Sequence, residues 1–300
     1  MIRRVADRLF DEGFLARLER LHLIGKQLAF RGSPGQRRSR RLGDGLEFAD
    51  HRDYAPGDDI RFVDWPYYAR MEKLLLRLFH EHGEGDVAIL LDASASMAPG
   101  GQADKFDHAR RAAAAIAYVA MGSLERVSCV PFAETTAPAI HTGRHRGRTF
   151  ELLEFLASLV PAGRTDQAGC VDQFVRRHAP KGTVMILSDL LDCAGVLSTC
   201  LARLRYVGCD AVVLHVYAPA DVSPPLHGAV LLHQAETDEL MNLHVTEDLL
   251  AGYRRRWDNF RRGCERACLS RGTIYVAAPT NLPFEDLVLR ALRQAGVLAE

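Results

Sequence analysis

The chain has 300 residues, of which 48% are apolar and 25% charged, a composition typical of a soluble globular protein that buries a sizeable core. Its formal net charge of zero argues against bulk electrostatic attraction to nucleic acid or to an anionic membrane. The sequence shows neither a signal peptide nor an apolar run long enough for a membrane span, and its seven cysteines include no CxxC pair. We therefore expect reduced thiols in a cytoplasmic protein, with at most peripheral membrane association.

The N-terminal part of the chain changes character twice. Residues 1–31 carry Leu, Phe and Ile at helical spacing, which predicts an amphipathic helix. Residues 32–58 are rich in Gly and Pro, which predicts a loop-rich stretch with one short strand near 46–48. Apolar content returns over residues 60–80. We assign residues 1–83 to an N-terminal region made of this helix and the loop-rich segment.

From residue 84 to residue 300, apolar runs alternate with helical patterns, which predicts an α/β domain. The expected strands are 86–91, 126–132, 183–188, 209–217 and 273–276, with a hairpin over 230–245. The expected helices are 104–122, 147–159, 167–178, 194–206, 247–270 and 284–295. This alternation predicts a doubly wound, mostly parallel sheet of Rossmann type, covered by helices on both faces. Ligands of such sheets bind at the carboxyl ends of the strands.

Oxygen-bearing side chains follow three of these strands. Asp92, Ser94 and Ser96 occupy alternate positions after the first strand, where a turn can aim them at a common point. Thr165 lies in a second loop, and Asp189 follows a third strand. Hard cations such as Mg2+ take oxygen ligands in near-octahedral geometry. These five residues are therefore our candidate metal ligands.

The three loops resemble the metal-ion-dependent adhesion site of von Willebrand factor A domains. The resemblance is carried by Asp-x-Ser-x-Ser at 92–96, Gly-x-Thr at 163–165 and Ser-Asp at 188–189, in that order and strand context. It covers about residues 84–295. It implies bound Mg2+, or Mn2+ or Ca2+ in its place, with an open position for the carboxylate of a Glu or Asp on a client protein.

The segment upstream resembles one bacterial family, domain of unknown function 58, whose members are associated with MoxR-type AAA+ ATPases. The matching stretches are 43–48, 52–65 and 69–70, with Val63 and Tyr68 as mild departures. The resemblance implies a non-enzymatic, chaperone-like partner of such an ATPase, working in the assembly or cofactor maturation of other proteins. The candidate docking residues are Arg52, Tyr54, Asp58, Asp59, Arg61, Asp64, Trp65 and Arg70.

Other interpretations of the same residues stay open. Asp92 and Asp189 are also suited to satisfying the backbone of a turn, and Ser94 and Ser96 to capping a helix. The charges of the docking set fit a turn held by local ion pairs, whereas Trp, Tyr and Arg suit an interface. The run Arg37–Arg41 is basic, and we favour a solvated loop or an acidic-partner contact over nucleic acid.

An alternative function is a metal-dependent hydrolase of phosphoesters. In that hypothesis Asp189 or Asp92 acts as the base and the ion acts as the Lewis acid. Two-metal enzymes of this kind need more carboxylates and histidines at the strand ends. The sequence offers Asp166 and Asp192 in addition, whereas Ser94 has no clear His/Asp relay nearby, which does not support a serine hydrolase.

Overall fold

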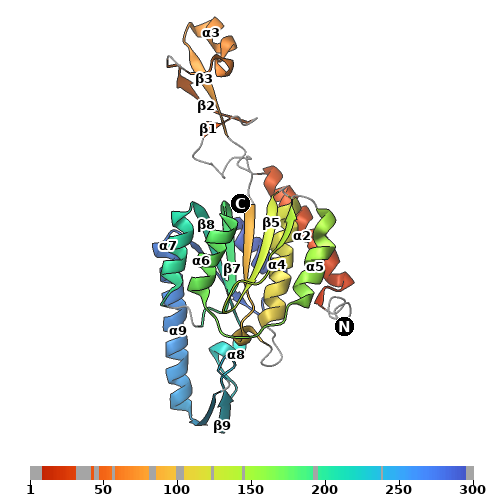
Figure 1. Ribbon diagram of the computed structural model, residues 1–300, viewed down its shortest axis with the longest axis vertical. Coiled ribbons are helices and arrows are strands. Elements are labelled where there is room, and N and C mark those ends of the chain that lie inside the picture. Colours follow the sequence, from red (N-terminus) through yellow and green to blue (C-terminus); the bar gives the residue numbers. More distant parts are fainter. Residues whose placement is uncertain are drawn as a thin grey trace. The chain divides into compact units, whose positions relative to one another are not determined.

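The computed structural model of the chain describes residues 9–31, 42–43, 47–55, 58–80, 86–98, 105–122, 125–143, 146–191, 195–237 and 239–294. The chain divides into two compact units (Figure 1). The larger unit combines residues 1–32 with residues 86–300, and the smaller unit comprises residues 33–85.

The larger unit is built on a six-stranded sheet in the order β11-β8-β7-β4-β5-β6. Its strands are β4 (Asp86–Asp92), β5 (Arg126–Phe132), β6 (Ile140–Gly143), β7 (Gly182–Ser188), β8 (Cys209–Tyr217) and β11 (Ile274–Pro279). All neighbours pair in parallel except β6, which is antiparallel to β5. The chain builds outward on both sides of the central pair β4 and β7, so the topological switch point lies between those two strands. The predicted doubly wound α/β class is confirmed.

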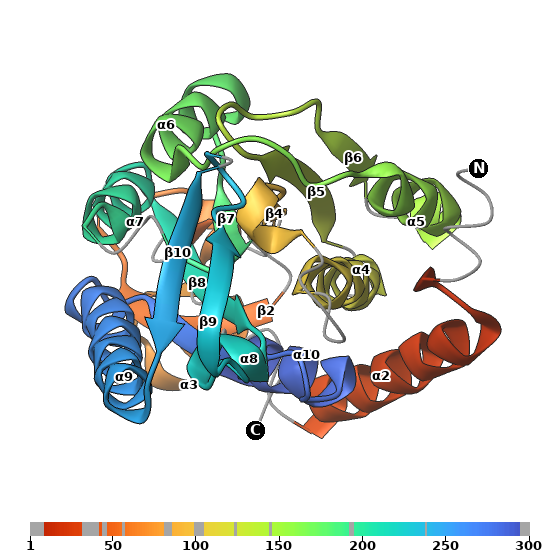
Figure 2. The ribbon, with the colours of Figure 1, turned by 90° about the horizontal axis from the view of Figure 1, so that it is seen from below.

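Helices cover both faces of this sheet (Figures 1 and 2). On one face lie α2 (Glu12–Arg31), α4 (Lys105–Gly122), α5 (Thr149–Ser158) and α10 (Phe284–Gln294). On the other lie α6 (Gln167–His178), α7 (Leu197–Tyr206) and α9 (Glu247–Ser270). Strand β4 feeds both cores, because Ile89 and Leu91 point into the first and Ala88 and Leu90 into the second. This two-sided burial explains why β4 is a continuous apolar run.

Helix α2 corrects the expected domain division at residue 83. The helix belongs to the larger unit, where Phe14 is fully buried and its ring lies 4.8 Å from that of Phe284 in α10. Arg17 pairs with Glu285 at 2.9 Å, and Arg111 of α4 donates to the carbonyl of Leu9 at 3.1 Å. The amphipathic pattern correctly predicted a buried face, but periodicity alone does not say which surface covers it.

The smaller unit contains more regular structure than the predicted loop and single short strand. Strands β1 (Leu42–Gly43), β2 (Glu47–Asp53) and β3 (Leu75–His80) form an antiparallel sheet in the order β1-β3-β2. A 3-10 turn (Ile60–Phe62) and the short helix α3 (Trp65–Met71) connect β2 to β3. Val63 pairs with Leu76 in an isolated bridge, which ties this connection to the sheet.

The predicted hairpin is confirmed as a separate two-stranded sheet of β9 (Gly228–His233) and β10 (Leu240–Val245). It follows β8 through the short helix α8 (Pro219–Val222) and leads into α9. Figure 2 looks onto the end of the sheet, with this hairpin in front of β7 and β8. Among the described helices, none has the length and apolar character needed to cross a bilayer.

Candidate functional site

The loop after β4 carries the first three candidate ligands. Asp92 is fully buried at the end of the strand, and its Oδ1 accepts the backbone N–H of Ser94 at 2.9 Å. The hydroxyl of Ser94 lies 3.0 Å from that of Ser96. Ser94 precedes a 3-10 turn (Ala95–Met97), but its side chain makes no capping hydrogen bond. Asp92 therefore does bond to the backbone of the turn, which is one of the two roles considered for it. Ser94 does not cap the turn, and its hydroxyl faces that of Ser96.

The loop after β7 meets the first loop directly. Ser188 donates its hydroxyl to Oδ2 of Asp92 at 2.6 Å and accepts the N–H of Leu190 at 3.0 Å. Asp189 is buried, and Lys105 at the start of α4 donates to its Oδ2 at 2.8 Å. Leu190 has a φ of 57°, a conformation that a bulky residue adopts only where its surroundings impose it. The loop is therefore held rigidly beside Asp92.

The loop that carries Thr165 is joined to the β4 loop through its backbone. The N–H of Ala95 donates to the carbonyl of Gly163 at 2.9 Å, and the N–H of Ala162 donates to the carbonyl of Ala93 at 2.8 Å. Gly163 has a φ of 78°, which favours glycine at this turn. The structure thus brings together the three loops that sequence analysis selected.

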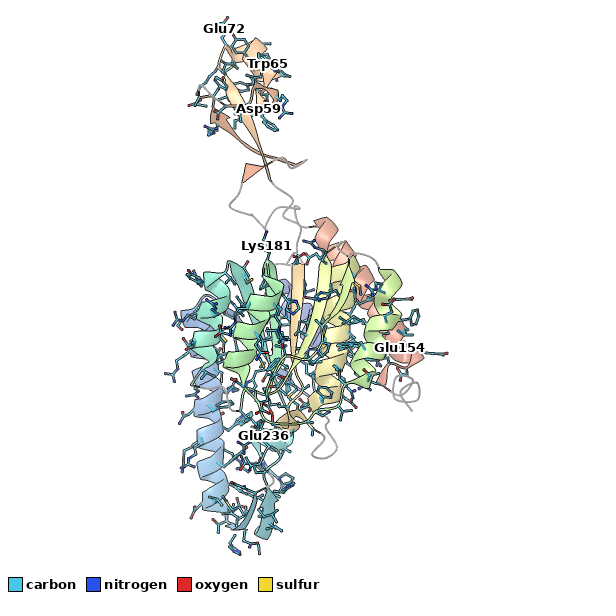
Figure 3. The ribbon with its side chains drawn as sticks, viewed as in Figure 1. Asp59, Trp65, Glu72, Glu154, Lys181 and Glu236 are labelled. Carbon is cyan, nitrogen blue, oxygen red and sulfur yellow. The ribbon has the colours of Figure 1, made fainter. Side chains whose placement is uncertain are left out.

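Thr165 has a partner that sequence analysis missed. Its hydroxyl donates to Oε1 of Glu236 at 3.1 Å, and its backbone N–H lies 3.4 Å from Oε2 of the same carboxylate. Glu236 lies in the turn between β9 and β10, and Figure 3 labels it at the hairpin end of the larger unit. No local sequence pattern predicts this contact, because Thr165 and Glu236 are 71 residues apart in the sequence. The hairpin was predicted, but the place its turn reaches was not.

Among the described side chains that contact the three loops, carboxylates outnumber the one lysine that pairs with them. Burial, and then the nearby charge of Asp189, raise the pKa of Asp92 to about 6. Lys105 is the neighbouring cation, paired with Asp189 and 3.8 Å from Asp221. A divalent ion would relieve the remaining repulsion between the carboxylates.

The donor set fits a hard cation. Carboxylate and hydroxyl oxygens lie on the three adjoining loops, and these are the ligands that Mg2+ takes. Within the described ranges, no three His, Cys, Asp or Glu side chains are grouped so that they could hold a metal ion. Any cation at this site therefore depends on the hydroxyls of Ser94, Ser96 and Thr165. Asp166, a candidate of the hydrolase alternative, caps α6 through the N–H of Gly169 at 2.9 Å, and Asp192 lies outside the described residues.

In the smaller unit, the charges of the candidate docking set pair locally. Arg52 donates to Asp58 at 2.8 Å, and Arg61 to Asp59 at 2.6 Å. Asp64 caps α3 by accepting the N–H of Tyr67 at 3.0 Å. These contacts match the interpretation of the charged residues as a folded turn, in which exposed pairs contribute little to stability.

The aromatic members of the docking set behave differently from one another. Tyr54 is half-buried, whereas Trp65 is 54% exposed and stands edge-on to Tyr68; Figure 3 labels Trp65 in this unit. Arg70 donates to the carbonyl of Pro66 within α3. Three further large apolar side chains among the described residues of this unit are exposed, Ile60, Met71 and Leu74. The run Arg37–Arg41 lies outside the described residues.

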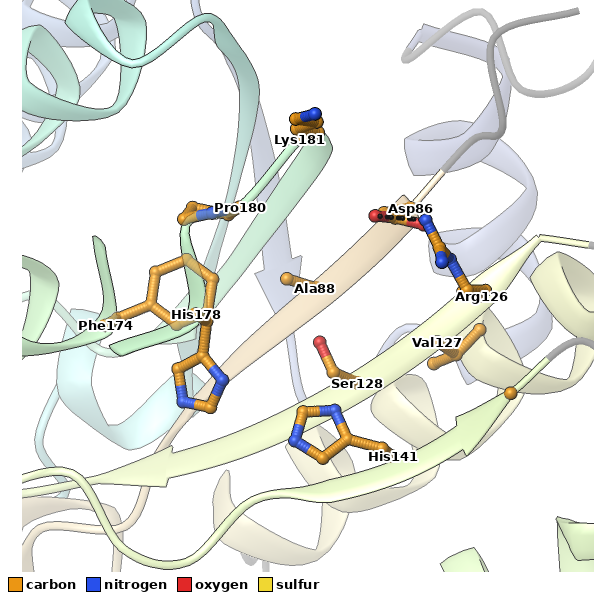
Figure 4. Close-up of a pocket in the computed structure, with 11 residues that line it drawn as sticks. Asp86, Ala88, Arg126, Val127, Ser128, His141, Phe174, His178, Pro180 and Lys181 are labelled. Carbon is orange, nitrogen blue, oxygen red and sulfur yellow. Dashed lines mark hydrogen bonds and ion pairs between the residues drawn. The ribbon is translucent and has the colours of Figure 1, made fainter. Parts of the chain in front are cut away.

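A cavity of about 260 Å3 lies at the opposite end of the sheet (Figure 4). Asp86 and Arg126, at the starts of β4 and β5, pair at its rim at 2.7 Å. Inside it, the rings of His141 and His178 lie 5.5 Å apart. Burial, and then the proximity of His141, lower the pKa of His178. Because this cavity is at the amino ends of the strands, it is separate from the candidate metal site.

The sheet order, the helices on both faces and the three loops at the switch point form an α/β domain that resembles von Willebrand factor A domains. The chain belongs to the family described as protein of unknown function DUF58, whose model matches residues 50–262. The predicted family is therefore confirmed. Uncharacterised proteins of Mycobacterium bovis and Mycobacterium tuberculosis are 30% identical to it over 268 residues, which are 86% of this chain and 82% of theirs.

Three solved structures match part of the chain at low sequence identity and with TM-scores below 0.5. An aerotolerance-related membrane protein from Bacteroides fragilis has a TM-score of 0.47 and 15% identity, covering 71% of this chain and all (100%) of that one. The conserved hypothetical protein BatB from Bacteroides thetaiotaomicron has a TM-score of 0.45 and 15% identity, covering 71% and 99%. The VWA domain of SpRpn10 has a TM-score of 0.41 and 12% identity, covering 69% and 94%.

Proposed function

We propose that this protein is a non-enzymatic interaction module that binds the carboxylate of a client protein through a Mg2+ ion. The residues that would hold the ion are Asp92, Ser94, Ser96, Thr165 and Asp189. The observation that supports this most directly is the convergence of three loops at the switch point. There, Asp92 contacts Ser188 at 2.6 Å and Ala95 contacts Gly163 at 2.9 Å.

The hydrogen bonds at the site favour binding over hydrolysis. Both oxygens of Asp92 already accept hydrogen bonds, one from the N–H of Ser94 and one from the hydroxyl of Ser188. Asp189 is held by Lys105 at 2.8 Å. Each carboxylate oxygen that accepts one hydrogen bond keeps one lone pair. In this proposal the ion takes that lone pair, which leaves none aimed at a water or substrate proton, as a general base would need. When bound, the ion supplies an electrophilic position for an incoming carboxylate.

The smaller unit is proposed as the docking surface for a MoxR-type AAA+ ATPase in the cytoplasm. Family resemblance suggests the partner, and the exposed side chains of Trp65, Tyr68, Ile60 and Met71 suggest the surface. Trp and Tyr often dominate the binding energy of protein interfaces. In this scheme the larger unit holds the client and the smaller unit holds the ATPase, in assembly or cofactor maturation of the client.

A pull-down from the lysate of the source organism tests this function. The tagged chain is incubated in Mg2+ or in EDTA, beside Ser96→Ala and the matched control Ser158→Ala, whose exposed hydroxyl bonds only its own helix. We expect a client to be retained only in Mg2+, by the wild type and by S158A. The ATPase should be retained by all the proteins in both buffers. Equal client retention in EDTA and by S96A would overturn the metal-dependent function.

A further inference from the structure

The turn of the β9–β10 hairpin brings a carboxylate to the candidate metal site. The turn is closed by a hydrogen bond from the N–H of Gln234 to the carbonyl of Glu239 at 2.9 Å. Glu236 projects from it and accepts from the hydroxyl of Thr165 at 3.1 Å and from its N–H at 3.4 Å. Both donors that Thr165 offers therefore point at one carboxylate.

This carboxylate has the chemistry of the group that the proposed function assigns to a client. Among the described residues, the hydroxyls of Ser94, Ser96 and Ser188 form their hydrogen bonds within the three site loops. The hydroxyl of Thr165 instead donates to a residue outside those loops. A carboxylate that bonds the hydroxyl of Thr165 occupies the space beside it. A client carboxylate approaching an ion held by Thr165 would compete for that same space.

The hairpin is a tethered element and not part of the main sheet. Its strands pair only with each other within the described chain. Leu231, Leu240 and Met241 on it are each about 60% exposed, which shows that it is only partly packed. The hydroxyl of Thr237, next to Glu236, is buried without a hydrogen-bond partner among the described residues. We infer that the turn can leave the site, because the strands that carry it pair only with each other within the described chain and expose their apolar side chains.

We propose that Glu236 is an intramolecular ligand that occupies the Thr165 side of the site until the carboxylate of a client displaces it. This inference rests on the proposed function, because it assigns the regulation of the same site. Tethering gives Glu236 an effective concentration in the millimolar range, so a free carboxylate of equal intrinsic affinity competes poorly. Only a client that adds contacts elsewhere displaces the turn, which makes the hairpin a filter for specific clients.

A hairpin peptide supplied in trans tests this. The probe is a fluorescent peptide of residues 230–243, with a second peptide carrying Glu236→Gln as its control. Binding is measured by anisotropy to the full-length wild type, to Glu236→Ala and to the matched control Glu239→Ala, each in Mg2+ and in EDTA. Glu239 lies in the same turn and is exposed, and urea unfolding midpoints establish that the three proteins are equally folded.

We expect E236A to bind the Glu peptide at least about ten-fold more tightly than the wild type and E239A do, which is about 1.4 kcal/mol. The Gln peptide should lose this gain. If the ten-fold gain persists in EDTA, the intramolecular contact is supported and the metal dependence of the site is refuted. Equal binding to the wild type and E236A, or binding to neither, overturns the inference. A Mg2+ titration of the same proteins then measures metal binding independently of the peptide.

Discussion

Replacing Lys105 with Met removes the ammonium group that lies 2.8 Å from Asp189 while keeping the length of the apolar stem. Only 10% of the side chain of Lys105 and 4% of that of Asp189 are exposed. The substitution leaves Asp189 as a buried, unpaired charge beside the buried Asp92. Removing one partner of such a pair costs about 3–5 kcal/mol. We expect K105M to lose about 3 kcal/mol of the free energy of unfolding, the lower end of this range, because water can solvate part of the unpaired charge.

Urea unfolding at neutral pH measures this loss, with Arg126→Met as the matched control. Arg126 pairs with Asp86 at 2.7 Å, but their side chains are 52% and 31% exposed, so the control should lose at most about 1 kcal/mol. Adding Asp189→Asn to K105M should recover part of the loss, since it removes the stranded charge. Bound Mg2+ should also stabilise K105M, by about 2.7 kcal/mol at a hundred times its dissociation constant. A loss no larger than that of R126M would refute the reasoning that the pair is buried and coupled to the site.

Three further predictions concern other parts of the molecule. Phe14→Ala should cost about 3–5 kcal/mol in urea unfolding, because its fully buried ring holds α2 against α10; a loss below about 1 kcal/mol would mean that the helix is not part of the larger unit. Burial, and then Arg111, lower the pKa of His108 from 6.5 to about 4, so the unfolded chain binds the proton more readily and stability falls as pH falls from about 6.5 to 4. Replacing His108 with Leu should therefore remove about 2 kcal/mol of the stability difference between about pH 7.5 and pH 5; an unchanged pH profile contradicts the buried neutral imidazole. Trp65→Ala should leave stability within about 0.5 kcal/mol, since its side chain is 54% exposed, yet abolish retention of the ATPase; retention equal to that of the wild type would contradict the docking surface.

The sequence predicted the loops of the site because they follow a rule with local signals. Asp92 and Asp189 each follow a short apolar strand, and carboxyl ends of parallel strands meet at one edge of a sheet. The alternation of Asp92, Ser94 and Ser96 is equally local. The structure places these residues on adjoining loops, as expected.

The parts that were missed depend on long-range contacts. Glu236 contacts the site from a hairpin turn, and Lys105 contacts it from the start of α4. Neither residue belongs to a sequence motif that predicts this contact. The edge strand β6 (Ile140–Gly143) is short and antiparallel, so it lacks the apolar run that marked β4. The strands of the smaller unit were obscured by the Gly and Pro around them, which predict loops.

The hydrogen bonds of the site also explain why the fold tolerates a buried carboxylate there. Asp92 would be costly to bury alone, but two hydrogen bonds, one from the N–H of Ser94 and one from the hydroxyl of Ser188, satisfy both oxygens. Burial and the charge of Asp189 still raise the pKa of Asp92. A cation bound at the hydroxyls would oppose this rise, which is the physical basis of the proposed metal dependence.

A calorimetric titration of Mg2+ into the purified chain tests the metal-binding claim most directly. The proteins compared are the wild type, Asp92→Asn, Ser96→Ala and the control Ser158→Ala, each shown to be folded by its urea unfolding curve. We expect one Mg2+ per chain in the wild type and S158A, with binding weakened at least about ten-fold in D92N and S96A. No binding to the wild type, or equal binding to all four proteins, would contradict it.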